Sequence, residues 1–176
     1  ATARTGKLQS KIYESSTVAG LTVILDFHKN GFQSQHEPMR SELAVTAAIS
    51  IVNTVQLLGQ QVGLLTNGRD AAERMRQQGW DVELDDRQQA QQAGAMLAEN
   101  DRLRPLQVPT QRSSEQFHRI QELLARVEIS DGLEFASLLL EAQSRVPRDA
   151  TILAIISKEN TQSTIALGNL ARQGFA

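Results

Sequence analysis

The chain has no cysteine among its 176 residues, and only 4% of its residues are aromatic. The missing thiols exclude disulfides, thiolate nucleophiles and cysteine metal sites, but they leave the cellular compartment open. So few aromatic side chains argue against a surface on which nucleic-acid bases stack. The formal net charge is only −2, so no charge excess draws the chain to nucleic acid or to an anionic membrane. We therefore expect no nucleic-acid partner.

Long hydrophobic runs are also missing. No apolar stretch of the sequence approaches the roughly 20 residues of a membrane helix, and no signal peptide is recognisable. We therefore expect no direct membrane contact by this segment. The chain begins at Ala1 without a methionine, and it stops at Ala176, after a predicted helix where the fold would continue with another strand. We expect a segment of a longer protein that is truncated at both ends.

Short apolar runs predict the buried strands of a parallel sheet. Ala19–Leu25 and Thr151–Ile156 are almost continuously apolar, which is typical of strands covered by helices on both faces. Gln61–Leu65 predicts a further strand, and a helix between it and the first strand begins at Pro38 and ends at Gly59. The apolar residues of this helix recur at helical spacing at Leu43, Ala47, Ile51, Val55 and Leu58. A strand, a helix and a strand joined in this way make a parallel pair.

The remaining elements complete a doubly wound α/β domain. Lys7–Tyr13 alternates polar and apolar residues, which predicts an edge strand with one face in water. Leu106–Val108 predicts a short strand that is ended by Pro109. Later helices are predicted after a cap at Ser113 or Ser114, after a cap at Asp131, and over Thr161–Arg172. We expect one Rossmann-like domain over residues 1–176, with a mostly parallel sheet, helices on both faces and an antiparallel edge strand.

The segment Asp70–Arg104 differs in composition from the rest of the chain. It begins with a charged helix predicted over Asp70–Gln78, followed by a short exposed strand at Trp80–Leu84. A helix rich in glutamine and alanine is predicted over Arg87–Glu99, with only a thin apolar stripe. We interpret this segment as an insertion or a peripheral subdomain within the single domain.

Polar residues follow three of the predicted strands. They lie at Asp26–Asn30, at Thr66–Gly68 and at Ser157–Glu159. In an open parallel sheet the carboxyl ends of the strands meet at one edge, where such folds bind their ligands. We therefore expect these three segments to line one crevice.

The opening segment Ala1–Leu8 carries an alanine–arginine–x–glycine pattern before a predicted strand. Together with Asp26, Val62–Leu65 and Ile120–Ala125, in that order, it resembles the bacterial family known as domain of unknown function fifty-eight, which has a von Willebrand factor type A-like fold. The resemblance covers nearly the whole chain except Asp70–Arg104. It implies a metal-ion-dependent adhesion site, in which hard oxygen ligands hold Mg²⁺.

Several of the residues at the implied adhesion site depart from the family pattern. The crevice residues that the resemblance marks are Asp26, His28, Asn30, Ser130, Asp131, Ser157 and Lys158. Asp26 matches the first ligand, but His28 stands where a serine is usual and Lys158 stands at the expected aspartate. Imidazole favours softer metals, and an ammonium repels a dication. We predict a degenerate site with no cofactor and no metal, Mg²⁺ being disfavoured, in which His28 or Lys158 pairs with Asp26. The alternative is that Asp26 only caps N–H groups at the strand end.

A second resemblance is to the haloacid dehalogenase hydrolases. Asp26 lies where their nucleophile lies, and Leu64–Gly68 is similar to their second motif. That chemistry needs a second aspartate two residues after the nucleophile as the general acid and base, and His28 stands there. A phosphohydrolase with Asp26 as nucleophile is therefore the alternative function.

We expect a non-enzymatic protein-interaction module with no catalytic residue. The first resemblance implies the cytoplasmic domain of a membrane-anchored bacterial protein whose anchor lies outside this segment. It also implies a MoxR-type AAA+ ATPase as partner. A carboxylate of the partner would bind Lys158 directly through a charge-assisted hydrogen bond.

Overall fold

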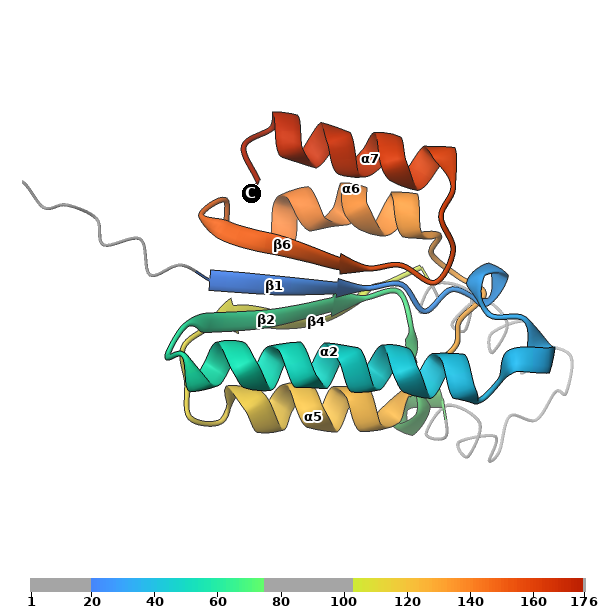
Figure 1. The fold of residues 1–176 in the computed structure, drawn as a ribbon, viewed down its shortest axis with the longest axis horizontal. Coiled ribbons are helices and arrows are strands. Elements are labelled where there is room, and N and C mark those ends of the chain that lie inside the picture. Colours follow the sequence, from blue (N-terminus) through green and yellow to red (C-terminus); the bar gives the residue numbers. More distant parts are fainter. Residues whose placement is uncertain (1–19, 75–102, 176) are drawn as a thin grey trace, which may run out of the picture.

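The computed structural model describes residues 20–74 and 103–175, which form a sheet covered by helices on both faces (Figure 1). The strands of the four-stranded sheet are β1 (Gly20–Leu25), β2 (Gln61–Thr66), β4 (Leu106–Gln111) and β6 (Ala150–Ile155). They lie in the order β4-β2-β1-β6. β1 pairs parallel with β2 and with β6, whereas β4 is antiparallel to β2 at one edge. The structure thus confirms the predicted α/β architecture with a mostly parallel sheet.

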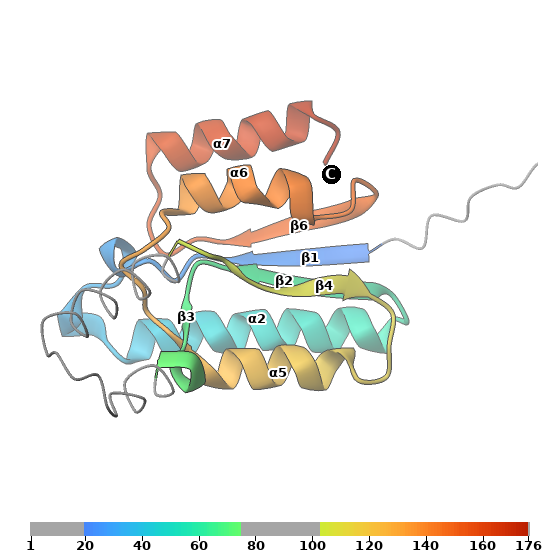
Figure 2. The ribbon, with the colours of Figure 1, turned by 180° about the vertical axis from the view of Figure 1, so that it is seen from behind.

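Two pairs of helices cover the two faces of the sheet. α2 (Met39–Leu57) and α5 (Gln116–Arg126) lie together on one face, and α6 (Phe135–Arg145) and α7 (Thr161–Arg172) lie together on the other, as the opposite views of Figures 1 and 2 agree. Two short strands, β3 (Arg69–Asp70) and β5 (Val127–Glu128), form a separate antiparallel pair. Sequence-predicted elements at Lys7–Tyr13, Trp80–Leu84 and Arg87–Glu99 lie outside the described residues.

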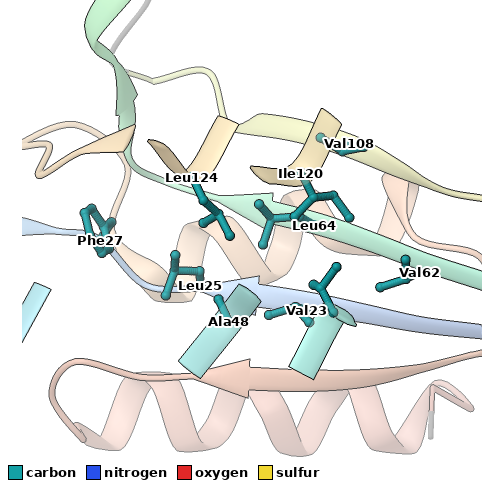
Figure 3. Packing of buried hydrophobic residues seen from close by; sticks show 10 residues of the cluster. Val23, Leu25, Phe27, Ala48, Val62, Leu64, Val108, Ile120 and Leu124 are labelled. Carbon is teal, nitrogen blue, oxygen red and sulfur yellow. The ribbon is translucent and has the colours of Figure 1, made fainter. Parts of the chain in front are cut away.

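Each buried strand supplies side chains to both faces, which explains the continuous apolar runs. Val23 and Leu25 pack with Leu64 in the cluster beneath α2 and α5, which Figure 3 shows from close by. Ile24 and Leu65 point the other way and pack against α6 and α7. All five side chains are fully buried. Successive side chains of a strand point to opposite faces, so β1 and β2 need apolar residues at every position that a helix covers.

Only some of the apolar residues that recur at helical spacing in α2 are buried. Leu43 and Leu58, at the two ends of that pattern, have side chains that are 67% and 71% exposed. Ala48 and Val52 are the fully buried residues of this helix. Apolar residues lie on several sides of α2, so the helical spacing alone fits more than one stripe. The contact with β1 and β2 selects the stripe that contains the small Ala48, because a small side chain lets the helix approach the sheet.

The two outer strands also depart from expectation. β4 does not end at Pro109 but continues to Gln111, with a register shift opposite Val62 and Leu64. An edge strand tolerates proline because one side of its backbone has no partner strand, and an irregular register removes the need for the missing N–H. β6 was expected to be buried on both faces, yet Thr151 is exposed and most of the strand is only half-buried. Within the described residues β6 pairs with β1 alone.

Candidate functional site at the carboxyl edge of the sheet

Three parallel strands end side by side and place their following residues together. Leu25 is in register with Thr66 on β2 and with Ile155 on β6. The backbone N–H of Asp26 then donates to the carbonyl of Ile155 at 2.9 Å. The residues after the strands, Asp26, Asn67 and Ser157, therefore meet at this edge, as the topology predicts.

Neutral donors surround the carboxylate of Asp26, which is only 5% exposed. Its Oδ1 accepts a hydrogen bond from Asn67 Nδ2 at 3.0 Å and another from the backbone N–H of His28 at 3.2 Å. Its Oδ2 accepts a hydrogen bond from the hydroxyl of Ser157. Both carboxylate oxygens are thus occupied by groups that belong to the ends of β1, β2 and β6. A buried carboxylate needs such donors, because an unpaired one would be costly to desolvate.

Asn67 joins the network to the backbone on two sides. Its Oδ1 accepts from the N–H of Phe27 at 2.6 Å, and its Nδ2 also donates to the carbonyl of Leu133 at 2.9 Å. Asn67 is 2% exposed, so its amide satisfies groups that water does not reach. Asn67 was expected at this edge of the sheet but not among the site residues. The sequence signal that could have identified Asn67 as a site residue is its position directly after an apolar strand and before Gly68.

His28 has a structural contact at the start of the loop after β1. Its Nδ1 accepts from the N–H of Asn30 at 3.3 Å and so caps the short 3-10 helix Lys29–Gly31. The contact between His28 and Asp26 comes from the backbone N–H of His28 and not from its imidazole ring. Asn30 is exposed at the same helix. Capping N–H groups in this way is a common local use of a polar side chain.

Ser130 and Asp131 approach the site from the segment between β5 and α6. Ser130 forms a parallel bridge with His28, in which its N–H donates to Phe27 at 3.0 Å and its carbonyl accepts from Lys29 at 2.8 Å. Asp131 lies at the rim, with Oδ2 at 3.3 Å from Lys29 Nζ. Asp131 does not cap α6, whose N-cap is Glu134. The expected cap is wrong because the chain runs three further residues along the sheet edge before it turns into the helix.

Ser157 is held tightly in the place next to Asp26. A Cβ added at Gly31 would overlap the hydroxyl of Ser157, so only glycine allows this approach. Arg40, in the first turn of α2, donates from Nη2 to the carbonyl of Ser157 at 3.0 Å. Lys158 is exposed, and within the described part of the chain it has no hydrogen bond or ion pair. The expected pairing of His28 or Lys158 with Asp26 is therefore not seen, and the hydroxyl of Ser157 donates to Asp26 instead, whereas Lys158 is exposed.

The surroundings of Asp26 offer one carboxylate together with hydroxyl and amide groups. Mg²⁺ prefers an octahedral shell with one or two carboxylates and several water molecules. Asp26 is the carboxylate at this edge whose oxygens face Ser157 and Asn67, and both oxygens already accept hydrogen bonds. In residues 20–74 and 103–175, no group of three or more histidine, aspartate and glutamate residues lies close enough to hold a metal ion.

A separate ion pair connects the segment after β3 with β5. Arg74 donates from Nε and from a terminal nitrogen to the two carboxylate oxygens of Glu128, each at 2.7 Å. These hydrogen bonds hold the pKa of the Glu128 carboxyl below its usual range and raise the pKa of Arg74. Arg126 adds a weaker contact to Asp70 at 3.5 Å. The pairs attach the beginning of the sequence-predicted insertion to the body of the domain.

None of the described helices combines the length and the apolar character that a bilayer span requires. Comparison of the chain with protein-family models, with curated proteins and with solved structures finds no match. The two family resemblances of the sequence thus stay predictions.

Proposed function

We propose that the chain is a non-enzymatic protein-interaction module of the von Willebrand factor type A-like kind, with a degenerate adhesion site at the carboxyl edge of the sheet. The observation that carries the proposal is the hydrogen-bonded state of Asp26. Hydrogen bonds from groups at the ends of β1, β2 and β6 hold both oxygens of this carboxylate, which supports a role in fixing the strand ends over a role as a nucleophile or a metal ligand. A carboxylate held in this way keeps the ends of the three strands in fixed positions. Side chains next to these strand ends can then contact a partner.

The binding groups in this proposal are cations at the rim. Lys158 directly follows Ser157, and Arg40 contacts the carbonyl of Ser157. Both side chains are exposed. A partner carboxylate that docks here would receive a charge-assisted hydrogen bond from the ammonium, in place of the metal contact that an intact adhesion site makes. Asp26 supports this contact indirectly, because it fixes the position of Ser157.

The resemblance stated above supports a particular partner and setting. We propose a MoxR-type AAA+ ATPase as the partner, and the cytoplasmic portion of a membrane-anchored bacterial protein as the setting. In this proposal the anchor lies outside the segment, and the described residues make no contact with lipid.

Binding of a purified MoxR-type ATPase to the full chain tests the proposal. Replacing Lys158 with Ala should weaken binding by roughly tenfold or more, because a hydrogen bond to a charged group contributes about 1.5–3 kcal/mol. Arg148→Ala is the matched control, since Arg148 is an exposed cation beside the opposite end of β6. Equal binding by the Lys158→Ala variant and the unmodified chain, with loss of binding in Asp26→Ala, would count against the role of the ammonium.

The alternative, a phosphohydrolase with Asp26 as nucleophile, has less support. The hydroxyl of Thr66, which would hold a phosphoryl group, is fully buried and accepts from the N–H of Gly68 at 3.1 Å. Titration with Mg²⁺ together with a phosphate analogue separates the two functions. The interaction module should bind neither, whereas binding of both at Asp26 would favour the hydrolase.

A further inference from the structure

A polar cavity opens at the end of the sheet opposite Asp26. It lies where the turn between α2 and β2 meets the turn between β4 and α5, which both views place at the amino ends of β1 and β2 (Figures 1 and 2). Its volume of about 420 Å³ falls within the range of about 300–1,000 Å³ that is usual for ligand sites. None of the described residues that line it is acidic.

Gln116, the first residue of α5, lines this cavity with an amide of fixed orientation. Its Nε2 donates to the carbonyl of Val62 at 2.8 Å and to the carbonyl of Pro109 at 2.6 Å. These bonds lie where the register between β2 and β4 shifts, and they use both N–H groups of the amide. Gln116 is 2% exposed, and in the described part of the chain nothing donates to its Oε1. The amide is left with one acceptor that lacks a donor.

Two more amides in the lining have the same unmet need. Gln56 lies in the last turn of α2, and Gln60 directly precedes β2. The Oε1 atom of each is buried and has no hydrogen-bond partner, whereas buried acceptors in proteins are normally paired. Both residues are only half-buried, so a rotation of the side chain brings the oxygen to a ligand. Three acceptors of the cavity thus require donors from outside the chain.

The opposite need exists at the rim, where a cation has no partner. Arg112 is exposed, and within residues 20–74 and 103–175 it forms no hydrogen bond or ion pair. It lies beside the turn after α2, because a Cβ built at Gly59 would be 3.5 Å from Arg112 Nη2. Ser113 and Ser114 add hydroxyl donors at the start of α5, where the N–H groups of a helix also favour an anion. This side of the cavity is suited to a carboxylate.

We propose that the cavity binds the carboxyl-terminal end of a polypeptide. The terminal carboxylate contacts Arg112 and the two serines through charge-assisted hydrogen bonds. The last backbone N–H groups of the same peptide donate to the oxygens of the three glutamines. A ligand with an ammonium group fits less well, because no acidic residue is among the described lining residues. An inorganic anion leaves the amide oxygens without donors.

Two synthetic peptides test this recognition on the full chain. Acetyl-trialanine carries a free carboxylate, and the same peptide with a carboxyl-terminal amide does not. We expect acetyl-trialanine to bind with a Kd of about 1 mM or lower, and the amide to bind about tenfold more weakly or worse. In an NMR titration the backbone N–H groups of Ser113 and Ser114 and the side-chain amide of Gln116 should shift. The N–H of Lys158, at the other end of the sheet, should not.

Three variants separate the two halves of the cavity. Arg112→Gln removes the exposed cation and should abolish the preference for the free carboxylate. Gln60→Met keeps the length of the side chain but removes the acceptor, so it should weaken the binding of both peptides and retain the preference. Arg104→Gln is the matched control, because Arg104 is exposed and does not line the cavity, and it should bind as the unmodified chain does.

Three outcomes would overturn the proposal. Equal binding of the two peptides by the unmodified chain means that the carboxylate is not recognised. Acetate that binds as tightly as acetyl-trialanine, with no effect of Gln60→Met, means a site for a small anion only. Absence of shifts at Ser113, Ser114 and Gln116 with either peptide up to about 10 mM means that the cavity binds no peptide end. The cavity is distant from the Lys158 rim, so these outcomes are independent of the proposed function.

Discussion

Asn67 Nδ2 lies 3.0 Å from Asp26 Oδ1, and this hydrogen bond links the ends of two neighbouring parallel strands. The same Asn67 amide accepts from Phe27 and donates to Leu133, so one buried side chain joins β1, β2 and the segment before α6. Ser157 completes the arrangement from β6. The edge that looks like a ligand site from the topology is thus a network of satisfied polar groups.

Replacing Asn67 with Asp should destabilise the protein strongly. The substitution keeps the shape but turns the donor to Asp26 into an acceptor, and it places two carboxylates in contact away from water. We expect a loss of about 3 kcal/mol or more in the free energy of unfolding, measured by urea denaturation. Asn53→Asp, on the exposed side of α2, is the control and should change stability by less than about 0.5 kcal/mol. Similar losses in both variants would contradict the network.

Replacing Gly31 with Ala should disturb the position of Ser157. The added Cβ would overlap the Ser157 hydroxyl, so the loop after β1 has to move. We expect a destabilisation of about 2 kcal/mol. Gly168→Ala on α7 is the control, because nothing lies within 4 Å of its added Cβ, and it should stabilise the helix by about 0.5 kcal/mol. Thermal unfolding of the two variants should therefore shift in opposite directions, and a shift in the same direction would refute the close approach.

The packing of α6 against the sheet can be tested on one helix. Leu138 is fully buried, whereas Leu140, two residues later, is 61% exposed. Leu138→Ala should lower the free energy of unfolding by about 3 kcal/mol, because it removes apolar contacts and leaves a cavity. Leu140→Ala should change it by less than about 0.5 kcal/mol. A larger loss at Leu140 would mean that this face of α6 is covered by another part of the protein.

The ion pair between Glu128 and Arg74 should contribute to stability in a pH-dependent way. The hydrogen bonds from Arg74 lower the pKa of Glu128 in the folded protein. Stability from a lowered pKa is present above the pKa of the unfolded chain, near about 4.3, and it is lost as the pH falls through the folded value. We expect Glu128→Gln to be less stable than the unmodified protein at neutral pH, and the difference to shrink as the pH falls through the lowered pKa of Glu128 in the folded protein.

The pH experiment has a matched control in a solvent-exposed pair. Glu115 lies 3.3 Å from Arg119 on α5, and both side chains are largely exposed. Glu115→Gln should have little effect at neutral pH, because exposed helical ion pairs contribute only a few tenths of a kcal/mol. If the difference between the unmodified protein and Glu128→Gln persisted unchanged in acid, the ion pair would not be its cause.

Local sequence patterns were enough to predict the sheet and most of its helices. β1 and β2 are short apolar runs, and α7 was predicted at Thr161–Arg172, where the structure has it. Such features depend on the residues of one segment, so a single sequence reveals them. The meeting of Asp26 with the ends of β2 and β6 also followed from the strand order, because parallel strands end at one edge.

The partners of each side chain required the tertiary structure. Lys158 and Ser157 are neighbours in sequence, and only the close approach of Gly31 and Arg40 determines that the hydroxyl, and not the ammonium, reaches Asp26. Likewise α2 carries apolar residues on several sides, and the sheet selects Ala48 for the contact.

The sequence by itself therefore determined the buried strands β1 and β2, most of the helices, and that an acidic residue follows the first strand. The tertiary structure alone decided which groups contact that acid. A carboxylate can serve in a metal site, as a nucleophile or as a structural cap, and the donors that reach Asp26 come from segments that are distant in sequence, which no local pattern reveals.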